Sequence, residues 1–560
     1  MFAKHETRPT PQVVYNWRIY WAACLASWVA VIIGYDAGFV GGMIALKSFK
    51  KEFGFDKMTP SEQSWVSETV VSLFQAGAFF GAFLIYPLGS KYGRKISLAV
   101  ASVLLIVGSA IQLASNSKTG LAAMYAGRVL TGLGIGAVSN LAPMYSAEVS
   151  PDAIRGRLVG LFEISWQIGG TIGFWINYGT SVNIPDDEAK QWQIPVALQL
   201  IPAGIFGIGL YTLVESPRWL FTVGKREQAL KNLCYLRQLD PEDEYIKYEV
   251  AIMEEEVEQK RAKIGLGLWD PFIKLFRSSS LRYRLLLSTS TFIIQNTLAV
   301  NAVNYYSPRI FQTMGISSLD SSLLSTGIFG ILKGVFCLVW SLFIVDRFGR
   351  RPSFIFGLVV CSLCMWYIGG YIKIGKPTSR GEDAGLDAGG KASLALFYIW
   401  TIAYAVSWSG TPWVWNTEVF PSNLKSATSS VNAASNWFWA FIMARFTNQM
   451  IDKMKYGIFF FFAAMMTVCL PIFFLLYPET KNIPVEYVDE LFRHKAWRAH
   501  GEVMKLIAEG KENDLEEGQN VLMGVNASSR DLESKGIEKP DVEIVSMVGS
   551  SQGDAASKNG

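Results

Sequence analysis

The sequence predicts an all-α membrane protein whose twelve transmembrane helices form two pseudo-symmetric halves of six. Half of its 560 residues are apolar and only 18% are charged, which is too few to cover a water-facing surface of this size. The apolar residues gather in about twelve blocks, each long enough to cross a bilayer at roughly 20 residues per helix. Two short motifs also recur in both halves of the chain. Composition, block number and repetition together favour this fold class.

The twelve blocks are divided by one long charged segment, and the polar ends lie outside them. We expect membrane spans at residues 18–42, 68–88, 95–114, 121–141, 157–178, 194–214, 283–304, 322–345, 352–372, 395–415, 426–447 and 456–477. The domains that follow are an N-terminal cytoplasmic tail (1–17), a six-helix half (18–214), a cytoplasmic helical linker (215–282), a second six-helix half (283–477) and a cytoplasmic tail (478–560), disordered beyond about residue 510.

Short basic loops set the orientation. Lys91, Arg94 and Lys95 follow the second span, and a similar cluster at 347–351 follows the eighth. The positive-inside rule places both loops in the cytosol. An even number of spans then puts both termini there too. We expect a multi-pass protein of the plasma membrane that functions as a monomer in the lipid bilayer.

Several classes of function are excluded by what the sequence lacks. The net charge is only +4 and no Lys/Arg run indicates nucleic-acid binding. No phosphate-cradling loop is present, and no nucleophile lies beside a histidine in the membrane, so we expect neither an enzyme nor an ATP-driven pump. The six cysteines are scattered, and we expect no metal and no cofactor. The three histidines lie outside the apolar blocks, so a proton that crosses the membrane must use a carboxylate.

The repeated motifs predict a gating network. Gly93-Arg94-Lys95 corresponds to Gly349-Arg350-Arg351, and the segment with Glu148 corresponds to the segment with Glu418. Glycine allows a tight turn, arginine binds carbonyls at helix ends, and each glutamate can pair with the arginine of its half. We expect such a network to hold the cytoplasmic face closed and to break when that face opens, as the halves rock around a midplane site.

Many motifs in a fixed order resemble the sugar porters of the major facilitator superfamily. These are Gly127-Arg128, the segment 143–156, Glu215-Ser216-Pro217-Arg218-Trp219-Leu220, the segments 295–306 and 345–351, and Pro478-Glu479-Thr480-Lys481. The likeness runs from about residue 18 to 493 and implies the major facilitator fold. Gln295-Asn296 and the run 161–167 look most like fungal quinate permeases. Ser90, Val214, Ala299 and Gly334 depart from the common pattern and speak against an ordinary hexose as substrate.

The resemblance implies a set of substrate-binding and gating residues. A polyol needs donors and acceptors near the midplane and aromatic walls for its apolar face. Positions 295 and 299 or 302 lie one turn apart on a continuous helix, so part of this set can share a face. The family's positions fall here on the substrate residues Gln295, Asn296, Asn301, Trp413, Asn436 and Trp437, and on the gating residues Tyr305, Tyr306 and Arg155. The alternative for the amides is hydrogen bonding between helices, and for the aromatic residues it is core packing.

Asp36 and Arg128 are the best candidates for proton coupling. Ionisable groups inside a membrane are costly and indicate function. The resemblance places the two near each other, and an aspartate at position 36 is typical of proton-coupled members. We expect protonation of Asp36 to break its ion pair with Arg128 and permit rocking. The alternative is a static buried ion pair.

Glu163 and Lys333 are unusual charges for this family. Glu163 stands where many sugar porters have a substrate-binding glutamine, and Lys333 lies inside the eighth span. An anionic substrate requires a cation, which Lys333 or Arg445 can supply, with Glu163 as its partner or as a second proton site. Structural pairing or snorkelling of Lys333 is the alternative.

The leading interpretation is import of quinate or a related cyclic polyol acid by proton symport with alternating access. Facilitative or proton-coupled transport of a neutral hexose, pentose or polyol is the second interpretation. A non-transporting nutrient sensor is the third, although such sensors typically carry a much longer cytoplasmic tail. The partners implied are a small-molecule substrate and protons.

Overall fold

A computed structural model describes residues 10–265, 267–316, 318–377, 386–484 and 487–509, and this part of the chain forms helices and no strands. The described residues up to His500 make one compact unit, and the helical residues 501–509 belong to a second. The predicted disorder beyond about residue 510 lies outside the described residues. All further description concerns the first unit.

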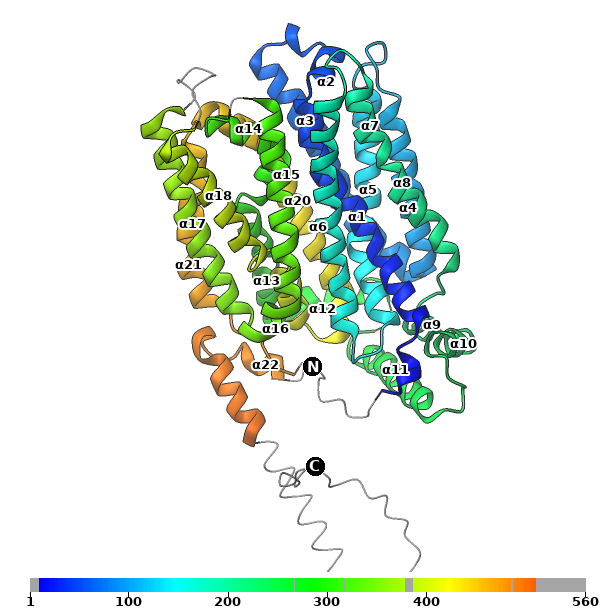
Figure 1. Ribbon diagram of the computed structural model, residues 1–560. Helices are drawn as coiled ribbons and strands as arrows, with labels where there is room; N and C mark the ends of the chain where they lie inside the picture. The colour runs from blue at the N-terminus through cyan, green and yellow to red at the C-terminus, as the bar shows by residue number, and fades with distance from the viewer. Residues whose placement is uncertain (1–9, 266, 317, 378–385, 485–486, 510–560) are drawn as a thin grey trace, which may run out of the picture. The chain divides into compact units, whose positions relative to one another are not determined.

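The first half contains six helical spans, and their helices are labelled in Figure 1. They are α1 (Trp17–Ala45), α3 (Pro60–Tyr92), α4 (Arg94–Leu113), α5 (Ala122–Val149), α6 (Arg155–Asn183) and the consecutive pair α7 (Lys190–Leu198) and α8 (Leu200–Gly209). A short helix, α2 (Lys47–Glu52), follows α1. Most of these helices extend beyond the predicted spans because their ends continue past the apolar core.

The second half repeats this order, but two of its spans are broken. Its helices are α13 (Ser279–Thr297), α14 (Val300–Thr313), α15 (Leu319–Val339), α16 (Val345–Phe348), α17 (Arg350–Gly375), α18 (Ala388–Ala405), α19 (Thr411–Glu418), α20 (Lys425–Met454) and α21 (Gly457–Leu476). The expectation of one continuous seventh span was wrong: α13 ends at Thr297, and Ala299 has a left-handed φ of 73°. The expected tenth span is likewise divided between α18 and α19.

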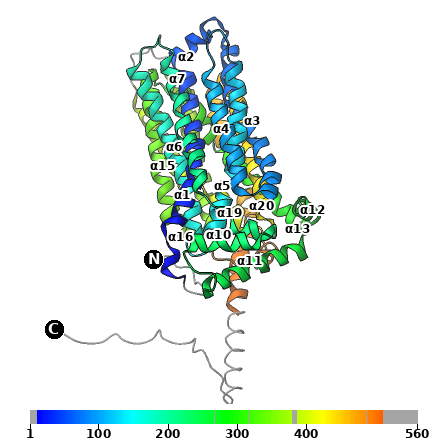
Figure 2. The ribbon, with the colours of Figure 1, turned by 90° about the vertical axis from the view of Figure 1, so that its right-hand side faces the viewer.

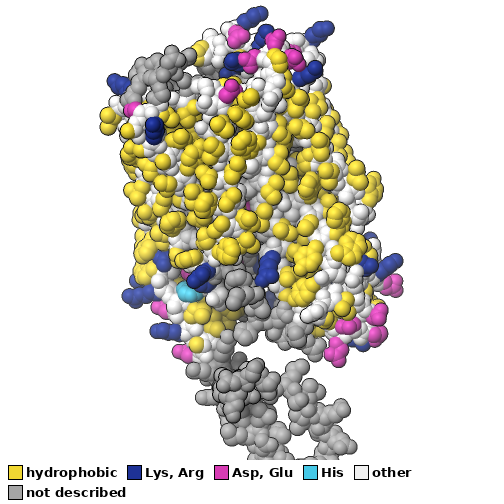
Figure 3. All heavy atoms as spheres, in the orientation of Figure 1, with side chains coloured by type: hydrophobic (Ala, Val, Ile, Leu, Met, Phe, Trp, Pro, Cys, Tyr) yellow, Lys and Arg dark blue, Asp and Glu magenta, His cyan; other side chains and the backbone are white. Residues whose placement is uncertain are grey.

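Seven described helices are long and apolar enough to cross a membrane by themselves, and they correspond to spans one, two, three, six, eight, nine and twelve. The other five expected spans carry more polar residues or contain a break. A helix that faces other helices needs less apolar surface than one that faces lipid. Hydrophobic side chains cover the middle of the face seen in Figure 3, and charged side chains gather at its two ends.

The predicted linker folds into α9 (Pro217–Thr222), α10 (Arg226–Arg237), α11 (Glu244–Lys263) and α12 (Asp270–Arg277). These helices lie at one end of the bundle (Figures 1 and 2), where α10 contacts the start of α1 and α12 contacts α13. Asn16 donates a hydrogen bond to the carbonyl of Leu236 at 2.8 Å, and Arg18 bonds the carbonyl of Tyr235. We call this end the linker end and the other the outer end.

Helices α1 and α6 pack closely through glycines. A Cβ atom on Gly34 would lie 1.8 Å from the carbonyl oxygen of Trp166, and one on Gly38 would lie 2.3 Å from that of Gly170. No larger residue fits at either position without moving a backbone. This contact fixes α6, which carries Glu163 and Gln167, against α1, which carries Asp36.

Candidate functional site

Asp36 and Arg128 form a fully buried ion pair between α1 and α5. Gln199, at the junction of α7 and α8, donates a hydrogen bond from Nε2 to Asp36 Oδ1 at 2.7 Å. Arg128 Nε bonds the carbonyl of Val70 at 3.0 Å, and its guanidinium lies 4.6 Å from the centre of the Phe74 ring. The predicted proximity of Asp36 and Arg128 is therefore confirmed.

This ion pair is incompletely satisfied. Asp36 Oδ2 and one terminal nitrogen of Arg128 are buried without a hydrogen-bond partner among the described residues. Burying an unpaired polar atom costs roughly 1–3 kcal/mol, and more when the group is charged. Protonating the carboxyl of Asp36 would therefore cost less free energy than protonating a carboxyl in an ion pair whose polar atoms all have partners.

The break between α13 and α14 holds the predicted polar motif. Gln295 Nε2 donates to the carbonyls of Trp408 and Ser409, at 2.7 and 3.2 Å. Asn296 lies 3.4 Å from Asn436, and Asn301 donates to Asn296 from across the break. The expected sharing of one helix face by position 295 and position 299 or 302 is corrected, because the helix does not continue through Ala299.

The predicted aromatic residues surround this motif. Trp413 packs on Phe292 with ring centres 4.7 Å apart. Trp437 is buried, stacks on Trp166 of the first half at 6.1 Å, and donates to Ser139 Oγ at 3.0 Å. The stacked tryptophans bring the two halves together beside the amide cluster.

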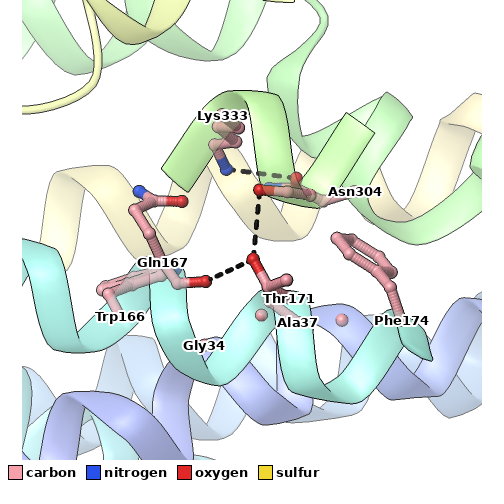
Figure 4. Close-up of a pocket in the computed structure, with 11 residues that line it drawn as sticks. Gly34, Ala37, Trp166, Gln167, Thr171, Phe174, Asn304 and Lys333 are labelled. Atoms are coloured by element: carbon pink, nitrogen blue, oxygen red, sulfur yellow. Dashed lines mark hydrogen bonds between the residues drawn. The ribbon is translucent and has the colours of Figure 1, made fainter. Parts of the chain in front are cut away.

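Lys333 lines a pocket between the halves rather than joining the amide cluster. Helices α1, α6, α14 and α15 form its walls, and Gln167, Thr171, Asn304 and Lys333 supply polar groups (Figure 4). The side chain of Lys333 is buried, and its Nζ donates to Asn304 Oδ1 at 3.3 Å. Among the described residues no carboxylate lies within 4.0 Å of Nζ.

Glu163 connects the pocket to the amide cluster. Its Oε1 accepts hydrogen bonds from Gln167 Nε2 and Ser409 Oγ, both at 2.7 Å, and Cys337 Sγ lies at 3.7 Å. Ser409 sits in the break between α18 and α19, and its carbonyl accepts from Gln295. The predicted substrate residues thus form two neighbouring groups that meet at Ser409.

Arg445, the other candidate cation, lies elsewhere. Its guanidinium bonds Thr69 Oγ1 at 3.0 Å, lies 3.9 Å from Glu68 and 5.5 Å from the Trp65 ring. These partners belong to the first part of α3, at the outer end. Arg445 therefore does not reach the pocket that Lys333 lines.

The outer end carries direct polar contacts between the halves that the sequence interpretation missed. Fully buried Glu68 accepts from the backbone and side-chain amides of Gln449, both at 2.9 Å. Ser64 donates to Asp452 at 2.7 Å, and Asp452 also pairs with Arg309. A glutamate inside an apolar span was the available signal for this contact.

The linker end carries the predicted repeat, residue for residue. Arg94 pairs with Glu148 at 2.8 Å and bonds the carbonyl of Gly89, while Glu215 accepts from the backbone amides of Arg94 and Lys95. Burial raises the pKa of Glu215 more than these bonds lower it. In the first half, one arginine and two glutamates are thus held together at a glycine turn.

The second half builds the same arrangement. Arg350 pairs with Glu418 at 2.6 Å and bonds the carbonyl of Val345, while Glu479 accepts from the backbone amides of Arg350 and Arg351. Gly93 and Gly349 have φ values of 97° and 88°, which glycine adopts readily. Each ion pair lies within its own half of the protein. Neither pair therefore joins the two halves directly. The gating role stays a prediction.

The other gating candidates occupy different places. Tyr305 is buried where the backbone of α14 touches Gly41 of α1, and the hydroxyl of Tyr306 donates to the carbonyl of Ala444 at 2.6 Å. The helix is kinked at Tyr306, and it continues to Thr313, beyond the expected end of this span. Arg155 pairs with Asp152 at the linker end, and Arg218 lies 3.9 Å from the same carboxylate.

This chain is similar to known proteins in sequence and in fold. The family described as sugar (and other) transporter matches residues 22–492. A probable quinate permease of Aspergillus terreus is 46% identical over 97% of this chain and 97% of its own length, and one of Aspergillus flavus is 48% identical over 91% and 96%.

Solved structures show the architecture. The proton:xylose symporter XylE of the major facilitator superfamily, bound to 6-bromo-6-deoxy-D-glucose, has a TM-score of 0.69 at 24% identity and covers 85% of this chain and 99% of its own. A partially occluded inward-open structure of XylE from E. coli has a TM-score of 0.67 at 23% identity, covering 84% and 100%. The fold is therefore that of the major facilitator superfamily, with twelve transmembrane helices in two halves. The chain belongs to the sugar transporter family, whose members are membrane transporters and not enzymes.

Proposed function

We propose that this chain imports quinate or a related cyclic polyol acid together with protons. The observation that carries the proposal is Lys333, a buried cation in the pocket between the halves whose Nζ has no carboxylate within 4.0 Å among the described residues. A charged group inside a membrane protein is costly unless it pairs with an opposite charge. A substrate carboxylate would provide that charge. The likeness to probable quinate permeases of two fungi supports the same substrate class.

The surrounding groups suit the rest of such a molecule. The amides of Gln167, Gln295 and Asn296 offer donors and acceptors for ring hydroxyls, and Trp166 and Trp413 offer apolar faces. A pocket with a few convergent polar groups and aromatic walls is typical of a small-molecule site. Substrate binding would therefore engage both halves, as alternating access requires.

Asp36 is proposed as the proton site. It is the carboxylate buried against Arg128, and Gln199 holds the bonded oxygen in place while Oδ2 has no partner among the described residues. Protonation would weaken the ion pair and release α1 from α5, which changes how the first half packs. The structurally similar XylE is a proton:xylose symporter, and this likeness supports proton coupling here.

Orientation and location follow from charge. We propose that the linker end is cytoplasmic, because basic residues cluster in its short loops. Asn16 and Arg18 attach the start of α1 to the linker helices, which supports a cytoplasmic N-terminal segment. The domain limits of the two halves and the linker are proposed as 18–214, 215–282 and 283–477, in the plasma membrane, with one chain sufficient for transport.

Competition for uptake tests the substrate class. In cells that lack their own transporter, unlabelled quinate and shikimate should compete with labelled quinate, whereas glucose and xylose should not. Lys333→Met should weaken quinate uptake by about 10- to 100-fold in KM, the value expected when a charged hydrogen bond of roughly 1.5–3 kcal/mol is removed. Lys391→Met, at an exposed lysine of α18, is the matched control and should change nothing. Dominant competition by a neutral hexose would overturn the assignment and favour a sugar as substrate.

A further inference from the structure

We infer that Glu163 takes up a second proton when the substrate carboxylate binds, so that each transported anion crosses with two protons and one net positive charge. This inference rests on the proposed function. Asp36 serves the first proton in a different place, between α1 and α5. Glu163 serves the second proton beside the substrate pocket.

The position of Glu163 makes it responsive to a bound anion. Gln167, one turn further along α6, donates to Glu163 and also lines the pocket with Lys333 (Figure 4). Lys333 and Cys337 lie one turn apart on α15, and Cys337 Sγ lies 3.7 Å from Glu163 Oε1. Glu163 is therefore connected to the region of Lys333 through one intervening residue on α6, Gln167, and through one on α15, Cys337. No ion pair within 4.0 Å joins Glu163 to Lys333 among the described residues.

The charges around Glu163 are few. Helix α15 brings Lys333 and Cys337 near Glu163, and α18 brings Tyr404. The loop before α19 contributes the hydroxyl of Ser409. Helix α6 itself contributes the neutral amide of Gln167. Lys333 is thus the cation whose charge acts on Glu163 in the described surroundings.

Charge balance links the two binding events. With Lys333 charged and Glu163 ionised, the empty site is neutral. A substrate carboxylate beside Lys333 would leave the buried site with one uncompensated negative charge, which is unfavourable at low dielectric. A proton on Glu163 restores neutrality. Because coupling between two ligands is reciprocal, proton binding at Glu163 then strengthens anion binding by the same factor.

The hydrogen bonds of Glu163 can accommodate this proton. Its Oε1 takes the contacts from Gln167, Ser409 and Cys337, and no described residue bonds Oε2. A proton on Oε2 therefore leaves the contacts to both halves in place. Protonation changes the charge of the site without separating α6 from the break between α18 and α19.

The test is the charge moved per quinate in proteoliposomes that contain the full chain. With equal pH on both sides and a potassium–valinomycin potential, a carrier that moves one net charge accumulates quinate tenfold for each increment of about 59 mV, negative inside. The wild type should show this ratio. Accumulation that is driven by a pH gradient but insensitive to the potential would mean one proton per anion, and would overturn the inference while leaving the proposed function intact. Absence of any quinate uptake would instead overturn the proposed function itself.

Two variants locate the charge. Glu163→Gln should still take up quinate in response to a pH gradient, but its accumulation should no longer respond to the membrane potential. Ser409→Ala removes a hydrogen bond to Glu163 and keeps the carboxyl, so it should retain one charge per quinate. A Glu163→Gln variant that keeps the potential dependence of the wild type would assign the second proton to another group. Since the wild-type ratio is informative alone, the test does not depend on whether Glu163→Gln folds.

Discussion

The two halves of this transporter are alike at the linker end and different in the middle. At the linker end, each half has an arginine that pairs with one glutamate, a second glutamate that accepts backbone amides, and a glycine turn of nearly the same φ. In the middle, the first half keeps its helices α1 and α5 continuous and buries an ion pair between them. The second half breaks its corresponding spans and lines the breaks with amides.

The difference indicates a division of labour. A continuous helix satisfies its own backbone, so α1 and α5 can hold a charge at fixed geometry. A broken helix frees backbone carbonyls, and those of Trp408 and Ser409 accept from Gln295 in just this way. Irregular backbone inside a membrane protein is tolerated where other protein groups or a cavity cover it. Under the proposed function, the first half would hold a proton and the second would bind the substrate at its helix breaks.

Removing the charge of the first half should have the largest effect. Asp36→Asn would leave Arg128 as an uncompensated buried cation, which costs about 3–5 kcal/mol. We expect quinate accumulation driven by a pH gradient to fall well below the wild-type ratio, because only the proton on Glu163 would still cross with the anion. The accumulation ratio of labelled quinate at an imposed pH gradient measures it.

The double variant Asp36→Asn with Arg128→Met separates coupling from stability. It removes both charges, so thermal stability should recover towards that of the wild type while accumulation stays at the reduced level. If Asp36→Asn alone retained full gradient-driven accumulation, Asp36 would be a structural residue and the division of labour would fail at its first half.

Cutting the repeated network should test the likeness of the halves. Arg94→Ala leaves Glu148 without its arginine, and Arg350→Ala does the same to Glu418. Both arginines are mostly buried, so each change should cost about 3 kcal/mol. The apparent Tm of the purified protein in detergent should fall by similar amounts in the two variants. A much larger effect of one variant would show that the two networks do different work.

The outer end offers a test of contact between the halves. Glu68→Gln cannot accept from both amides of Gln449, so about 1 kcal/mol of stabilisation between α3 and α20 should be lost. We expect a cysteine at Ser64, which is buried at this interface, to react about fivefold faster with an impermeant maleimide added outside.

Glu62→Gln is the matched control for that labelling. Glu62 lies on the same helix, but it caps the start of α3, and its described hydrogen bonds are to Thr59 rather than to the second half. Its substitution should leave the labelling rate unchanged. Equal rates in both variants would place the closing contact elsewhere on the interface.

The fold and the repeat were predicted because each leaves a strong local signal, whereas the Asp36–Arg128 pair was predicted from the resemblance to sugar porters. Apolar blocks of membrane length and repeated Gly-Arg motifs are visible without tertiary information. The contacts of Gln199 with Asp36 and of Ser409 with Glu163 were missed, because a single amide or hydroxyl in a span is ordinary until its partner is known. The helix break at Ala299 was also missed, because alanine is a strong helix former and gives no sign of a break.

The smallest expected effect concerns that break. Ala299 adopts a left-handed φ of 73°, which costs a residue with a Cβ about 1–2 kcal/mol. Glycine lacks that cost but loses more entropy on folding, so Ala299→Gly should raise stability by up to about 1 kcal/mol. Ala302→Gly, three residues further on and inside regular α14, should lower it by roughly 1 kcal/mol. Opposite shifts of the apparent Tm for two identical exchanges in one short segment would identify the break as a feature of backbone geometry. Two shifts of the same sign would mean that the chain at Ala299 is helical, and the contrast between the continuous first half and the broken second half would lose its clearest example.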